Sequence, residues 1–259
     1  MSDTILIERA GAVTTLRLND PATMNAMTPQ MAHDLHDALK DAVAAGARAI
    51  ILAGSERAFS TGANLKAAMP KDITGFDVGE TLENDYNPLM RTIRDLPVPL
   101  ISAVRGAAAG VGASLALVCD VIVAGKSAYF LEAFARIGLV PDGGATWLLT
   151  RAVGRVRAME MMLLAEKIPA PQAHDWGLIT RLAEDDAVED TAQALAEKLA
   201  DGPARAHALI RQAAWAAVDA DFDTALQTER HLQKQAGETL DFAEGLAAFH
   251  EKRAPRFNG

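Results

Sequence analysis

The stretch VPLISAVRGAAAGVGASLALVCDVIVAG (98–125) decides the fold. It begins with a short apolar run, continues through a turn rich in glycine and alanine, and ends with a helical segment and a second apolar run, DVIVAG. Short apolar runs bounded by turn residues are typical of buried strands. Strands that alternate with helices along the chain are the signature of an α/β fold. This stretch therefore predicts an α/β domain.

The same alternation precedes this stretch. Residues 4–9 and 12–18 are β-branched or alternate in polarity around Ala10-Gly11, which predicts a hairpin. A helix is expected to begin at Thr28-Pro29. The run ARAIILAG (47–54) is short and apolar, so it predicts another buried strand.

The pattern changes after residue 150. Apolar residues there follow helical spacing, and no run longer than about four residues is typical of a strand. No Ser/Gly-rich linker separates the two parts of the chain. We therefore predict a single domain, with an α/β core over residues 1–195 and a helical C-terminal extension over residues 196–259.

The composition limits the class of protein. The chain has 259 residues, 50% of them hydrophobic, which is enough for a sizeable core, and its formal net charge is −9. Binding to nucleic acid depends on clustered Lys and Arg, so this acidic chain is not expected to bind it. No apolar run reaches the roughly 18 residues of a membrane-spanning helix and no signal peptide is apparent, so we expect a soluble, cytoplasmic protein. The histidines show no metal-binding spacing, so no metal site is predicted.

Two glycine-containing turns each follow a predicted strand, in RAFSTGANLK (57–66) and RGAAAGVGASLAL (105–117). The second lacks the Gly-Lys-Ser/Thr of a P-loop and matches a dinucleotide fingerprint only in part. Its G-A-S-L-A segment approximates the nucleophile elbow of serine hydrolases, which makes Ser114 an alternative nucleophile. Two such turns that aim unpaired N–H groups at one oxygen would form an oxyanion hole. Close helix packing without a ligand is a further alternative.

Five segments of the chain resemble, in this order, the crotonase (enoyl-CoA hydratase/isomerase) superfamily. They are PATMNAM (21–27), AFSTGANL (58–65), AVRGAAAGVGASLALVCD (103–120), FARIGLVPDGGATWLL (134–149) and AHDWGLI (173–179). The resemblance runs from about residue 4 to the C-terminus. It implies an α/β fold built as a spiral of ββα units with a C-terminal helical extension. It also implies acyl-CoA thioesters as substrates, with coenzyme A entering as part of the substrate and no separate cofactor.

The resemblance further implies where the thioester binds. In the family, the two glycine-containing turns donate backbone N–H groups to the thioester carbonyl, and these positions fall on Ala63 and Val111. The CoA of the substrate is expected along the N-A-M and S-T-G-A-N-L segments. Its candidate contacts are Ala26, Thr61, Leu65 and Lys66. The C-terminal helices of similar proteins form trimers and hexamers, so a homotrimer or homohexamer is implied.

The resemblance also singles out one carboxylate. Similar hydratases use two glutamates around a water, at positions that hold Ser114 and Phe134 here. Asp142, in the IGLVPDGG turn, is the carboxylate in a comparable place. An acid in this context occurs in Δ3,Δ2-enoyl-CoA isomerases and in the 1,2-epoxyphenylacetyl-CoA isomerase of phenylacetate breakdown, to which residues 86–117 are especially similar. From the residues alone, Asp142 could instead serve the turn or cap a helix near Gly143.

We therefore expect an acyl-CoA isomerase in which Asp142 moves a proton while the two turns stabilise an enolate, without a redox cofactor. The alternatives are an enoyl-CoA hydratase that uses another acid, a serine hydrolase that uses Ser114, and a non-catalytic acyl-CoA-binding protein. Related dehalogenases pair an aspartate at this position with a histidine, and His33 and His36 are the histidines upstream. Glu132 is interpreted as a solvent-facing strand residue.

Overall fold

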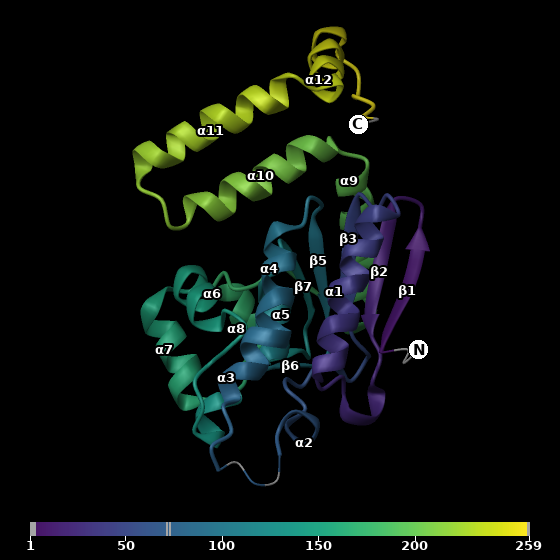
Figure 1. Cartoon of the computed structure of the whole chain (residues 1–259). Coiled ribbons are helices and arrows are strands. Elements are labelled where there is room, and N and C mark those ends of the chain that lie inside the picture. The colour runs from purple at the N-terminus through teal and green to yellow at the C-terminus, as the bar shows by residue number, and fades with distance from the viewer. Residues whose placement is uncertain (1–3, 71, 73, 258–259) are drawn as a thin grey trace.

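The computed structural model describes residues 4–70, 72 and 74–257, and its centre is a six-stranded sheet with the order β1-β2-β3-β5-β7-β10 (Figure 1). The predicted hairpin is present, because β1 (Ile5–Ala10) and β2 (Val13–Leu18) pair antiparallel. The strands that continue the sheet in parallel are β3 (Ala49–Ala53), β5 (Leu100–Val104), β7 (Val121–Gly125) and β10 (Arg181–Ala183). β3 and β5 are buried along their whole length, which explains their continuous apolar sequences.

A second, smaller sheet repeats the order of the first. Its strands are β4 (Ala58–Ser60), β6 (Ala107–Ala109), β8 (Tyr129–Leu131) and β9 (Ile168–Pro169). β3, β5 and β7 of the large sheet lead in turn into β4, β6 and β8 of the small one, and helices follow each pair. The chain is therefore an α/β spiral of ββα units, as expected.

Helices cover both faces of the large sheet. On one face lie α1 (Pro29–Ala44), α4 (Asn87–Asp95) and α5 (Val111–Leu117). The helix α1 begins where the sequence predicts, and the Thr28 side chain accepts a hydrogen bond from the Met31 N–H. The opposite face is covered by α9 (Val188–Ala200), whose small buried residues allow close contact with the sheet. The predicted boundary between core and extension, after residue 195, falls inside this helix.

Shorter elements connect these units. They are the 3-10 helices η1 (Pro21–Thr23), η3 (Ala133–Ile137) and η4 (Asp185–Ala187), the π-helix η2 (Leu82–Tyr86), and the helices α2 (Leu65–Ala68), α3 (Val78–Thr81), α6 (Ala145–Ala152), α7 (Gly154–Leu164) and α8 (Ala170–Asp175). In the described part of the chain, no helix has the length and apolar character needed to cross a membrane.

The last three helices extend away from the sheets (Figure 1). They are α10 (Ala204–Ala217), α11 (Phe222–Gly237) and α12 (Leu240–Glu251). Arg211 attaches α10 to the core: its buried guanidinium donates to Asp120 Oδ2 at 2.7 Å and to the Ile93 carbonyl at 2.9 Å, near the end of α4. By contrast, α12 exposes large apolar side chains, with Leu240 at 87% and Phe249 at 77% exposure.

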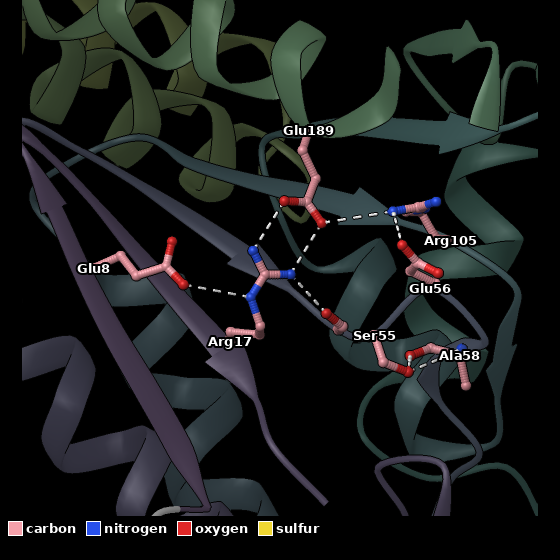
Figure 2. Close-up of polar contacts among 8 residues, drawn as sticks. Glu8, Arg17, Ser55, Glu56, Ala58, Arg105 and Glu189 are labelled. Atoms are coloured by element: carbon pink, nitrogen blue, oxygen red, sulfur yellow. Dashed lines mark hydrogen bonds and ion pairs between the residues drawn. The ribbon is translucent and has the colours of Figure 1, made fainter. Parts of the chain in front are cut away.

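A charged cluster attaches α9 to the hairpin (Figure 2). Arg17 of β2 donates to both carboxylate oxygens of Glu189, at 3.0 and 2.9 Å, and also to the Gly54 carbonyl. Glu8 lies 3.6 Å from the same guanidinium, and Arg105 lies 4.0 Å from Glu189. The first turn of α9 is therefore linked to β2 and to Arg105, the residue that follows β5.

Candidate active site

The two glycine-containing turns touch through their backbones. Gly62 has φ +93°, and a Cβ at this position would lie 2.8 Å from the Ala109 carbonyl oxygen. Gly110 has φ +53°, and a Cβ there would lie 3.7 Å from the Gly62 Cα. L-residues with a side chain rarely adopt these conformations, and at Gly62 there is no space for one. Glycine at both positions thus allows the ends of β4 and β6 to meet.

The first turn leaves the Ala63 N–H pointing away from the segment that it pairs with. Met27 N–H donates to the Gly62 carbonyl at 2.7 Å, and Asn64 N–H donates to the Met27 carbonyl at 2.8 Å. Successive N–H groups of an extended segment point to opposite sides, so the Ala63 N–H points away from Met27. Ala63 is one of the residues that line a cavity.

The second turn supplies the N–H of Val111, which is the first residue of α5. The first N–H groups of a helix have no acceptor within it, so this donor is available to a ligand. The turn itself is fixed, because Gly110 N–H donates to the Leu131 carbonyl at 2.8 Å and the Gly110 carbonyl accepts from Ala113 and Ser114. Val111 and Ala63 line the same cavity.

Asp142 faces this cavity from the turn between η3 and α6. Its backbone carbonyl accepts hydrogen bonds from Ser114 Oγ at 2.9 Å and from Ala145 N–H at 3.0 Å. The cap of α6 is Gly144, with no side-chain cap hydrogen bond, so the carboxylate is not used as a helix cap. Its Oδ1 atom is buried and has no hydrogen-bond partner in the described part of the chain. Burial raises the pKa of Asp142 to about 6.

The cavity is apolar and has a volume of about 240 Å³. Of the residues expected to contact CoA, Thr61 and Leu65 line it. Ala26 is buried and does not line it, and Lys66 is exposed on α2. The structure therefore brings Asp142, both turns and two of the four expected CoA contacts to one cavity.

Two aromatic side chains shape the cavity wall. Phe134 packs against the second turn, with its Cζ atom 3.6 Å from where a Cβ on Gly110 would be. The Tyr86 hydroxyl donates to the Met27 carbonyl at 3.0 Å, which braces the first turn. Burial raises the pKa of Tyr86, and the negative charges of Asp142 and Asp85 raise it further, so the phenol stays neutral.

Glu132 corrects the sequence-based interpretation. It was expected to face solvent, but its side chain is 0% exposed and neither carboxylate oxygen has a hydrogen-bond partner among the described residues. Burial, followed by the negative charge of Asp142, raises the pKa of Glu132 to about 8. Phe130 and Leu131 are both buried, so β8 has no solvent-facing side there and an alternating pattern of exposure does not extend to Glu132.

The groups proposed for other chemistries lie elsewhere. Ser114 is 0% exposed, does not line the cavity, and donates its hydroxyl proton to the Asp142 carbonyl. His33 pairs with Asp85 at 2.9 Å, and His36 with Thr92 at 3.0 Å, and neither histidine lines the cavity. Among the described residues, no group of three His, Cys, Asp or Glu side chains is placed to hold a metal ion.

This arrangement matches a known family over nearly the whole chain. The model of the enoyl-CoA hydratase/isomerase family matches residues 8–259. The chain belongs to this family. Its members act on acyl-CoA thioesters, which fits an apolar cavity with two converging turns.

Individual members divide between isomerases and hydratases. The 1,2-epoxyphenylacetyl-CoA isomerase of Escherichia coli (strain K12) is 42% identical over 262 residues, and all of both chains is covered. A Rhodobacter capsulatus protein named "Probable enoyl-CoA hydratase" is 43% identical over 99% of this chain and 98% of its own. The crystal structure of enoyl-CoA hydratase subunit I from Geobacillus kaustophilus HTA426 has a TM-score of 0.91 at 32% identity, covering 99% and 98% of the two chains.

Proposed function

We propose that this member of the family is an acyl-CoA isomerase. The thioester carbonyl accepts hydrogen bonds from the N–H groups of Ala63 and Val111, which stabilise the enolate oxygen. Asp142 removes a proton from the carbon next to the thioester carbonyl and returns it to another carbon of the substrate. The result is a shifted double bond in an enoyl-CoA, or a rearranged ring in an epoxide-bearing substrate. The observation that carries this proposal is that one carboxylate and both turns line a single apolar cavity.

Hydration is the second candidate, because several relatives carry that name. A hydratase must hold and activate a water as well as transfer a proton. The positions at which similar hydratases carry glutamates hold Ser114, whose hydroxyl is bonded to the Asp142 carbonyl, and the apolar Phe134. Isomerisation needs one base that both removes and returns a proton, and Asp142 suffices for it.

Binding of the CoA portion is proposed along the first turn. Thr61 and Leu65 line the cavity. Ala26 and Lys66 lie outside its lining, so we assign them to the adenosine or phosphate part of CoA. CoA enters with the substrate, and we propose no other cofactor.

The first prediction tests the base. In D2O, the wild-type protein should exchange the acidic C–H of a 3-enoyl-CoA and convert it to the 2-enoyl isomer. Asp142→Asn keeps the size of the side chain but removes the base, so turnover should fall by about 10²–10⁴-fold, the usual contribution of a general base. Proton NMR follows both exchange and product, and circular dichroism checks the fold.

The outcomes separate the alternatives. Retained turnover in Asp142→Asn would reject the proposed role. Water addition to crotonyl-CoA that exceeds isomerisation would identify a hydratase. CoA binding with neither exchange nor turnover would identify a non-catalytic binding protein, and labelling of Ser114 by a fluorophosphonate would identify a hydrolase.

We also propose a homotrimer or homohexamer. The exposed apolar side chains of α11 and α12, among them Phe222, Leu240 and Phe249, support an assembly that covers them.

A further inference from the structure

Glu132 is a buried acid that the proposed reaction does not use. It follows β8 directly and precedes Ala133 and Phe134, which line the cavity. Both of its carboxylate oxygens are shielded from solvent and have no hydrogen-bond donor in the described part of the chain. An isolated buried carboxylate without a partner costs far more free energy in its charged form than in its neutral form. The environment therefore favours the protonated form.

The charges around Glu132 reinforce this state. Asp142 is the ionisable group whose charge acts on it. The neighbouring β6 (Ala107–Ala109) and α5 (Val111–Leu117) contain no ionisable side chain. Arg136 of η3 also lines the cavity, but the residue is largely exposed and its guanidinium donates to the Ala165 carbonyl. The ionisable side chains of α7 and α8 are exposed as well. The Tyr86 phenol, which lines the cavity, is neutral.

Two carboxyl groups that interact in a dry site do not ionise independently. With Asp142 ionised as the base, a proton on Glu132 leaves the pair with one negative charge. Loss of that proton would place a second negative charge beside the cavity in which the enolate develops. In a site of low polarity such a charge disfavours the anionic intermediate.

We propose that Glu132 is a positioning residue that acts through Asp142: as a neutral acid it keeps the carboxyl pair singly charged, and its ionisation shuts down enolate formation. This inference rests on the proposed isomerase function, because the enolate is what the second charge opposes. The active form of the site then carries one proton on the pair, located on Glu132. No atom of Glu132 needs to touch the substrate.

The second prediction is a change in the pH profile. In the wild type, kcat/KM should rise through about pH 6 as Asp142 ionises and should fall above about pH 8 as Glu132 ionises. The fall should approach tenfold per pH unit, as expected for a single ionisation. Glu132→Gln keeps a neutral side chain of the same size, so it should retain activity near neutral pH and lose the alkaline fall. Glu160→Gln, on the exposed side of α7, is the matched control and should keep the wild-type profile.

A second measurement needs no turnover, so its result does not depend on whether a variant retains activity. Infrared difference spectra of the substrate-free wild-type protein should show a protonated carboxyl band at neutral pH that disappears above about pH 8. The band should be absent in Glu132→Gln and present in Glu160→Gln. In Asp142→Asn it should disappear at lower pH, because the neighbouring charge that raises the Glu132 pKa is gone.

Three results would overturn the inference. They are an alkaline fall that persists in Glu132→Gln, an ionised Glu132 at neutral pH, and a carboxyl band that titrates identically in wild type and Asp142→Asn. Failure of the isomerase proposal looks different: the infrared band behaves as described, but no substrate proton exchanges with solvent.

Discussion

At the scale of single residues, Ser114 links the helix that begins at Val111 to the turn that carries Asp142. Its hydroxyl belongs to α5, the helix that begins with the Val111 N–H, and it donates to the backbone of Asp142 at 2.9 Å. The packing is close here, because a Cβ on Gly143 would lie 2.8 Å from the Ser114 Cβ. The serine of the hydrolase-like motif therefore links the helix of one proposed oxyanion donor, Val111, to the backbone of the proposed base.

The third prediction follows from this contact. Ser114→Ala removes one hydrogen bond while leaving Asp142 and its second backbone partner, the Ala145 N–H, in place. Loss of the bond should raise the activation free energy by about 1 kcal/mol, which lowers kcat roughly 5-fold and changes KM little. Ser102→Ala is the control, since it removes another buried hydroxyl, bonded to the Ala116 carbonyl at 3.0 Å, outside the cavity. Equal kcat losses in both variants would reject a positioning role for Ser114.

The sequence could predict some of these residues and not others. Asp142 and the two turns lie in motifs that resemble a family, so their positions could be aligned without coordinates. Glu132 lies in no such motif, and its burial depends on contacts with segments distant in the sequence. A period-two pattern locates the buried side of a strand only when the other side meets water, and β8 does not provide that contrast.

At the scale of elements, α9 depends on charge as well as on apolar packing. Its buried face packs on the large sheet, and its first turn is bonded through Glu189 to Arg17 of the hairpin. The hydrogen bond from Arg17 is the largest cause that lowers the pKa of Glu189. A carboxylate whose folded pKa is lowered stabilises the fold above its unfolded pKa, and this contribution is lost as the pH falls through the folded value.

The fourth prediction uses this pH dependence. Glu189→Gln should lower the free energy of unfolding by about 1 kcal/mol at neutral pH, because the pair is half-exposed and screened by solvent. The difference from wild type should disappear at a pH below the lowered pKa of Glu189, where the wild-type carboxyl is protonated too. Urea unfolding at neutral pH and at a pH below the Glu189 pKa measures the difference in the free energy of unfolding. Glu197→Gln on the same helix is the control, since its exposed contact with Gln193 does not link α9 to the sheet, and it should change stability little at either pH.

The elements themselves were largely predictable. The Thr28 cap and the apolar spacing after it identify α1, and the continuous apolar runs identify β3 and β5. What the sequence could not provide is which elements share a surface. Arg211 illustrates this limit, because a charged residue on a helix reads as solvent-exposed, yet here it is 6% exposed and bonded to the carbonyl of Ile93 and the carboxylate of Asp120.

At the scale of the whole molecule, the C-terminal helices are incompletely covered. α10 and α11 pack on each other, and α10 is attached to the core through Arg211. The apolar side chains of Leu240 and Phe249 on α12 nonetheless face water in the single chain. Apolar surface of this kind is typical of a protein–protein interface.

The fifth prediction tests the proposed assembly. Leu240→Gln combined with Phe249→Gln should shift the protein toward smaller species, because each removes apolar area that an interface would bury. Sedimentation velocity across a range of concentrations measures the distribution, with Glu251→Gln on the same helix as the control. A wild-type protein that sediments as a monomer at every concentration would contradict the proposal.

The two proposed oxyanion donors have one property that side chains lack. Ala63 and Val111 would act through peptide N–H groups, and every residue except proline carries one. Alanine scanning would therefore reveal the role of the carboxyl groups but not that of these donors. Position 63 is already alanine, and Val111→Ala would keep the N–H. Replacing a single amide by an ester through chemical synthesis would expose their contribution. The proposed oxyanion hole of this chain would therefore tolerate most point mutations, and it would be lost through a proline at one of the two positions or through a change in the path of the backbone.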